Sequence, residues 1–265
     1  MTFMWFTSLL AAGLFIGMMI CIEIGRRFGI TRLAHTPDGL GKGIGPIEGA
    51  AFGLLGLLLA FTFSGAASRF VERRHLVTEE ANAISTAYLR VDLLPGDAQP
   101  EVREFFRRYL DSRLDTYRNP GGGSVAELVS AAKAKLAKSV VLQRELWAKA
   151  LAASQRPGAP PDGGKLLLPA LNTMFDITTT RAMATENHPP LVVFLLLVVL
   201  SLIGSLLVGY ATSGNKHRLW LHAVVFAAML SLVVLVIVDL EYPRLGLIRV
   251  DSADHVLLEL RQGMR

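Results

Sequence analysis

The chain has 265 residues, of which 52% are hydrophobic and only 18% are charged. A soluble globular domain carries about 25% charged residues, so this composition excludes an ordinary water-soluble monomer. The single cysteine, Cys21, excludes an intramolecular disulfide and a cysteine-based zinc site, because both need several thiols. The net charge of +5 is spread over the chain, so no strongly basic module points to nucleic acid.

Four segments are apolar enough to cross a membrane, whereas 31 of the 49 charged residues lie between Arg69 and Glu186. A bilayer core of about 30 Å needs about 20 apolar helical residues. The sequence therefore predicts an all-α integral membrane protein that is embedded in a lipid bilayer. The predicted transmembrane helices cover residues 2–24, 47–68, 191–212 and 219–239. Residues 69–188 are predicted to form a helical insert outside the membrane, and residues 240–265 a C-terminal tail.

The basic residues of the short loops predict an orientation, with Arg26, Arg27, Arg32 and Lys42 in the first loop and none in the N-terminus. They place that loop on the cytoplasmic side of a cell inner membrane and the insert on the periplasmic side. The arginines of the C-terminal tail favour the opposite orientation.

Small residues recur at four-residue spacing in every span, which lets helix backbones approach closely in lipid. In the second span, Gly49 and Gly53 are followed by a second such row that begins at Gly56, and this span is predicted to be the centre of packing. These small residues either allow tight packing within one four-helix bundle, or they form part of a subunit interface or of a pore wall. The same span carries hydroxyls beside aromatic rings, typical of a pore constriction or of ordinary helix contacts. These candidate pore residues are Phe61, Thr62, Phe63 and Ser64.

The insert is predicted to continue the membrane helices. No proline interrupts the chain between Pro46 and Pro95, so the second span extends into the insert as one helix of about 70 Å. Its outer half carries an apolar seam at seven-residue spacing, Phe70, Val77, Ile84 and Val91. Further helices are predicted over 101–118, 125–154 and 166–187, with a Pro- and Gly-rich loop over 155–164. A capping-box pattern at Ser124 and Glu127 opens the second of these, whose apolar face includes Val140 and Leu151.

Counting residues outward from the membrane predicts a polar network between two antiparallel helices of the insert. Residues 79 and 180 are each 11 positions from the membrane end of their helix, about 16 Å along it. We expect Arg181 to pair with Glu79 or Glu80, in a network that either fixes register or forms an ion site, ligand site or switch. The network residues are Glu79, Glu80, Asn82, Arg90, Asn172, Asp176, Thr180 and Arg181.

The sequence shows no pattern of a catalytic or metal site. The six histidines are scattered without metal-ligand spacing, and no nucleophile elbow or phosphate-binding lysine motif is present. No enzyme activity, metal or cofactor is therefore expected. Glu23 and Glu48 lie at the loop ends of the first two spans, where carboxylates are either solvated at the interface or functional, for example as an acidic ring. Asp239 is a further candidate carboxylate at the opposite membrane end.

Four stretches resemble a bacterial membrane family labelled "bestrophin-like domain", whose function is unknown. They are GAAFGLLGLLLAFTFSGAASRF after Glu48, EEANAISTAYLRVDLLP at 79–95, LNTMFDITTTRAMA at 171–184 and DLEYPRLGLIRV at 239–250. The resemblance implies similarity to bestrophins, which are pentameric four-span anion channels with a helical domain outside the membrane. It also implies a cytoplasmic insert, against the loop charges. No bestrophin pore signature is placed residue by residue, so no pore residue is carried over.

Two classes of function follow. The first is an oligomeric ion channel or permeation protein whose second span lines the pore and whose network couples the insert to a gate. The second is a non-conducting envelope scaffold or sensor whose insert binds a partner.

Overall fold

The computed structural model describes residues 2–35, 45–117, 125–215, 219–250 and 254–264. Every regular element in these ranges is a helix, as the composition and periodicity predict. The elements are α1 (Thr2–His35), α2 (Gly45–Leu89), η1 (Arg90–Leu93), α3 (Gln99–Tyr117), α4 (Val125–Ser154), α5 (Gly163–Glu186), α6 (Leu191–Ala211), η2 (Thr212–Gly214), α7 (Trp220–Glu241) and α8 (His255–Gly263). Lys42, Ser124 and Arg265 lie outside the described residues, as does the capping contact of Ser124.

The chain divides into two units, and α2 contributes to both. The membrane unit comprises Met1–Phe70 and His188–Ile248, and the helical unit comprises Val71–Asn187 and Arg249–Arg265. These boundaries lie within two residues of the predicted ends of the insert, but the second half of the tail belongs to the helical unit. Four helical stretches are long and apolar enough to cross a membrane, and they contain α1, α2, α6 and α7.

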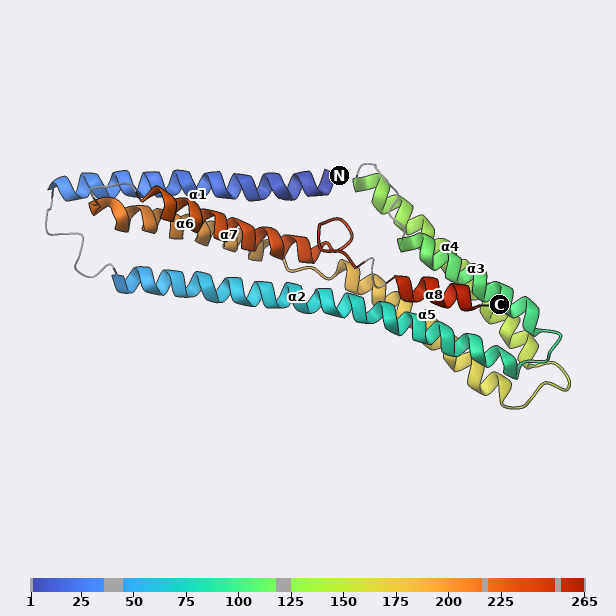
Figure 1. Cartoon of the computed structure of the whole chain (residues 1–265). Helices are drawn as coiled ribbons and strands as arrows, with labels where there is room; N and C mark the ends of the chain where they lie inside the picture. Colours follow the sequence, from blue (N-terminus) through green and yellow to red (C-terminus); the bar gives the residue numbers. More distant parts are fainter. Residues whose placement is uncertain (1, 36–44, 118–124, 216–218, 251–253, 265) are drawn as a thin grey trace. The chain divides into compact units, whose positions relative to one another are not determined.

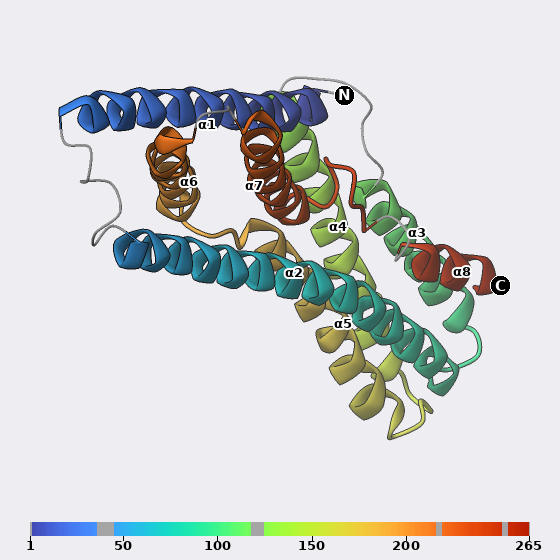
Figure 2. The same cartoon turned by 60° about the vertical axis from the view of Figure 1, so that its left-hand side comes forward.

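In the membrane unit, α6 and α7 lie between α1 and the first half of α2 (Figures 1 and 2). The helices α1 and α6 approach most closely, because glycines remove the side chains between them. A Cβ at Gly25 would overlap the carbonyl oxygen of Leu206, and a Cβ at Gly209 would overlap that of Ile22. The small-residue rows of α1 and α6 therefore serve packing within the chain.

The prediction that the second span is the centre of packing does not hold within the single chain. A Cβ added at Gly49, Gly53 or Gly56 would meet no atom of the described residues within 4 Å. The helix instead reaches its neighbours through long side chains, with Leu55 in one apolar cluster and the Phe52 ring edge-on to Phe226 at 6.0 Å. The glycine row of α2 is left without a partner in the chain.

In the helical unit, the outer half of α2 packs through the predicted seam, since Val77, Ile84 and Val91 are fully buried. The helix α3 contributes Phe106, Tyr109 and Leu110, also fully buried. The predicted apolar face of α4 is wrong in part, because Val140 is exposed. Among the α4 side chains that the structure describes, the buried ones are Ser139, Leu142, Leu146, Ala150 and Ala153.

The tail contains a helix that the sequence did not predict. The helix α8 buries Leu257 completely, and Arg261 forms two hydrogen bonds to Asp111 of α3, at 2.7 and 3.0 Å. Residues 255–263 thus form part of the helical unit.

Candidate functional site

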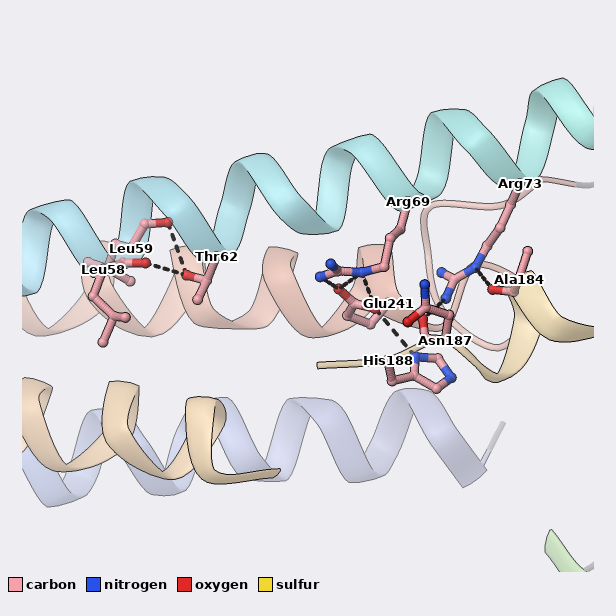
Figure 3. Close-up of polar contacts among 9 residues, drawn as sticks. All are labelled: Leu58, Leu59, Thr62, Arg69, Arg73, Ala184, Asn187, His188 and Glu241. Carbon is pink, nitrogen blue, oxygen red and sulfur yellow. Dashed lines mark hydrogen bonds and ion pairs between the residues drawn. The ribbon is translucent and has the colours of Figure 1, made fainter. Parts of the chain in front are cut away.

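A buried carboxylate, Glu241, joins three segments of the membrane unit at the end of α7 (Figure 3). Its side chain is 0% exposed. The guanidinium of Arg69, on α2, donates to both carboxylate oxygens, with Nε at 3.0 Å from Oε1 and 3.2 Å from Oε2. The Nδ1 atom of His188 lies 3.3 Å from Oε2. Glu241 therefore ties α2 and the segment before α6 to the end of α7.

Aromatic rings enclose one side of this cluster. The His188 ring stacks on Tyr242 with centroids 4.6 Å apart and planes 26° apart. Tyr242 in turn lies 5.1 Å from the ring of Phe3, near the start of α1. The orientation of the imidazole is thus set by a stacking contact as well as by the carboxylate.

Asp239 closes the turn that follows α7. It is buried, and its two carboxylate oxygens accept the backbone N–H groups of Leu247 and Ile248 at 2.9 and 2.7 Å. Gly246 makes room for this arrangement, because a Cβ there would overlap the Asp239 carboxylate. Asp239, predicted only to mark this end of the membrane spans, is thus a buried carboxylate that caps the turn.

The other two carboxylates at span ends differ from Asp239. Glu23 forms an exposed ion pair with Arg27 one helical turn later, at 3.0 Å. Glu48 is partly buried, and its Oε1 atom has no hydrogen-bond partner among the described residues.

The candidate pore residues lie on α2 and are mostly exposed in the single chain. The side chains of Phe61 and Phe63 are 67% and 44% exposed, and Ser64 is exposed. The hydroxyl of Thr62 donates to the carbonyls of Leu58 and Leu59 in its own helix (Figure 3), at 2.7 and 3.1 Å. Apart from the Thr62 hydroxyl, this part of α2 is free to face lipid, a subunit or a pore.

The helical unit contains a buried triad. Glu80 on α2 is 0% exposed and accepts hydrogen bonds from Arg181 on α5 and from Arg113 on α3. The Arg113 contact, Nε to Oε1, is 2.5 Å, and its side chain is 1% exposed. Burial acts to raise the pKa of Glu80, but the two guanidinium groups outweigh it and lower the pKa below its usual value. Arg181 therefore pairs with Glu80, which is one of the two partners predicted for it.

The remaining residues of the predicted network lie elsewhere. An open groove of about 620 Å³ between α2 and α5 is lined by Glu79, Asn82, Arg90, Asp176 and Thr180. Asn172 is exposed and does not line the groove. Glu79 pairs with His75 one turn earlier at 3.4 Å, and the Arg90 guanidinium donates to the carbonyl of Leu166. The predicted network thus separates into a buried ion triad and a polar groove.

Three residues that the structure places at these sites are not identifiable from the sequence. Arg113 lies on a helix whose spacing reveals only its apolar face, and Arg69 is one of many charged residues between the second and third spans. His188 had no partner at helical spacing, although it directly precedes the Pro189-Pro190 pair. Each partner is remote in sequence, so only the packing of the helices reveals them. Among the residues that the structure describes, no group of three or more His, Cys, Asp or Glu side chains is placed to hold a metal ion.

Comparison with known proteins agrees with this architecture. The model of the Bestrophin-like domain family matches residues 42–254. Two point variants of a bacterial bestrophin homologue from Klebsiella pneumoniae superimpose with TM-scores of 0.68 and 0.66, at 15% and 17% identity. These matches cover 95% and 93% of this chain, and 98% of the other chain in each case. Another crystal structure of a homologue from that organism gives a TM-score of 0.63 at 16% identity, over 93% of this chain and 98% of its own. A search of curated proteins finds no match. Because the family model spans most of its length, the chain belongs to the Bestrophin-like domain family.

Proposed function

We propose that this protein is the subunit of a homo-oligomeric ion channel or permeation pathway in which α2 lines the pore. Family membership and the shared fold support a channel-like membrane protein. The observation that carries the proposal is the unpartnered row of Gly49, Gly53 and Gly56 on α2. In lipid such a row is expected to pack against another helix or to face water, because the chain gains nothing from exposing it to acyl chains.

The proposed pore includes the aromatic and hydroxyl residues Phe61 to Ser64 farther along α2. A ring of subunits would bring these side chains around one axis, where apolar rings narrow a water-filled path and hydroxyls replace part of an ion's hydration. The pentameric state of bestrophins is the assembly proposed for this family member. Permeation of an inorganic ion, rather than catalysis, is the activity proposed.

Planar-bilayer recordings on the purified full-length protein test conduction. Phe61→Ala and Phe63→Ala are expected to change the unitary current, whereas Phe28→Ala is the matched control. Phe28 lies on α1 and is 66% exposed, almost the same as Phe61. Equal currents from all variants would refute a pore lined by these residues.

Mass measurement in detergent tests assembly. The proposal expects a homo-oligomer, and a monomeric protein without current would refute it. Cys21 is the only cysteine, so any disulfide cross-link formed through it joins two chains and supports the mass measurement.

The groove of the helical unit favours a second candidate, a non-conducting scaffold or sensor. Its acidic residues Glu79 and Asp176 and its hydroxyl groups form an open polar surface suited to a protein partner. This function requires no oligomer and no current. A protein that is monomeric and silent in bilayers, yet carries a partner lost on Glu79→Ala and Asp176→Ala, would favour the scaffold.

The membrane sidedness proposed from the loop charges puts the helical unit in the periplasm. The resemblance to bestrophins implies the cytoplasm instead. Alkaline phosphatase fused after the last residue is active in the first orientation and inactive in the second.

A further inference from the structure

We propose that His188 is a pH-sensitive latch, which holds the linker of residues 187–190 to Glu241 and tightens when the imidazole is protonated. This role concerns the membrane unit of the single chain and does not require ion conduction. It goes beyond the proposed channel, because it names a regulatory contact that would operate in this chain whether or not it conducts ions.

The difference in burial between His188 and Glu241 makes the His188 imidazole the group that would respond to pH. Glu241 is fully buried, whereas the His188 side chain is 27% exposed and so exchanges protons with solvent. Histidine changes charge between about pH 5 and about pH 8, a range in which carboxylates and guanidinium groups ordinarily stay charged. Within this cluster, the partly exposed imidazole is therefore the group through which a change of pH would act in the proposed latch.

Three neighbouring groups determine the sign of the effect. Glu241 of α7 contacts the ring directly at 3.3 Å, and its negative charge attracts a positively charged imidazole. Arg69 of α2 carries a positive charge that repels such an imidazole, but its hydrogen bonds are to the carboxylate. Tyr242 offers a ring face at 4.6 Å, which also favours a cation, and α1 contributes the apolar ring of Phe3 beyond it. Because the carboxylate and the tyrosine face contact the ring itself, we expect a positive charge on the imidazole to tighten the latch.

The latch acts on a segment that has little freedom to absorb a change. Pro189 and Pro190 follow His188, and each proline fixes its own φ. One residue before His188, the carbonyl of Asn187 accepts a hydrogen bond from Arg73 at 3.0 Å within the helical unit (Figure 3). Forming or breaking the His188–Glu241 contact therefore changes how rigidly the backbone is held between the end of α5 and the start of α6.

Hydrogen exchange measured by mass spectrometry on the full-length protein in detergent tests the latch. Exchange of peptides that cover residues 186–196 is compared at about pH 5.5 and about pH 8, on either side of the imidazole range, after correction for intrinsic rates. We expect protection about threefold to fivefold greater at the acidic pH, a size typical of a charge-assisted contact at a partly exposed site. His188→Gln should abolish the difference.

His75 provides the matched control. It pairs with Glu79 at 3.4 Å, nearly the His188–Glu241 distance, but its side chain is 63% exposed and Glu79 is 46% exposed. His75→Gln should leave the pH difference in residues 186–196 unchanged. If His188→Gln does not fold, His188→Phe retains a ring against Tyr242 and removes the titratable nitrogens.

Two results would overturn the proposal. The first is equal corrected protection at both pH values in the unmodified protein, and the second is a pH difference that survives loss of the His188 imidazole. Absence of current in bilayers would count against the channel but not against the latch, because the exchange measurement does not depend on conduction.

Discussion

Loss of the Glu80 carboxylate would leave two buried arginines, Arg113 and Arg181, without their shared counter-ion. Breaking a buried pair by removing one partner costs about 3 to 5 kcal/mol. We expect Glu80→Gln to lower the free energy of unfolding by that amount. In circular dichroism, the helical signal of the variant should be lost at a lower denaturant concentration. The neighbouring Glu79→Gln is the control, since Glu79 is exposed and its removal should cost no more than about 0.5 kcal/mol. Similar effects of the two variants would contradict the assigned role of the triad.

Acid should weaken the same triad. The pKa of Glu80 is lower in the folded protein than in the unfolded chain, where a glutamate side chain has a pKa of about 4.3. The stability that Glu80 contributes is therefore complete above that value and is lost as the pH falls through the folded pKa. Unfolding midpoints of the unmodified protein and of Glu80→Gln should converge below about pH 4. A constant difference down to about pH 3 would contradict this assignment.

At the residue scale, the sequence predicted contacts that depend on register along neighbouring helices. Counting from the membrane ends brought Glu80 level with Arg181, because two antiparallel helices share one rise per residue. Arg113 was not found, since the position of α3 around α2 depends on packing that no spacing encodes. The Arg69–Glu241 pair spans 172 positions and was missed for the same reason.

The glycines of α1 and α6 give a prediction at the scale of the element. Gly209→Ala places a methyl group against the backbone of Ile22, which cannot rotate away as a side chain would. We expect a loss of about 1 to 3 kcal/mol in unfolding free energy, the usual range for overpacking. Gly53→Ala on α2 is the matched control and should change the stability of the monomer by no more than about 0.5 kcal/mol. Equal losses in both variants would show that the two rows pack alike.

Helix boundaries were predictable because proline and glycine punctuate this chain strongly. The predicted helix over 125–154 has the bounds of α4, and that over 101–118 differs from α3 by two residues at most. The buried face of α4 was not predictable from its large apolar residues. It is built in part from Ser139, Ala150 and Ala153, whose small size permits close packing but gives no hydrophobic signal.

At the scale of the whole molecule, the helical unit and the C-terminus are expected on the same side of the membrane. Leu257 and Arg261 of α8 pack within the helical unit, so no span separates them from it. Alkaline phosphatase fused after the last residue and inserted in the loop at residues 155–162 should report the same side. One active and one inactive fusion would contradict the placement of α8.

The apolar ends and the charged middle of the sequence were enough to predict four spans and an insert. The assignment of the tail was incomplete, because a nine-residue amphipathic helix gives a weak signal beside four long spans. The packing partner of the α2 glycines also could not be predicted from the sequence. A row of small residues has the same pattern whether it packs against a helix of its own chain or of another chain.

The turn after α7 constrains how this chain can change over evolution. The carboxylate of Asp239 and any side chain at Gly246 compete for one volume, and the same carboxylate holds the backbone at Leu247 and Ile248. Neither position can be exchanged alone without disturbing the other. Across an alignment of related chains, the two sites should therefore covary, with larger residues at position 246 only where position 239 is no longer acidic.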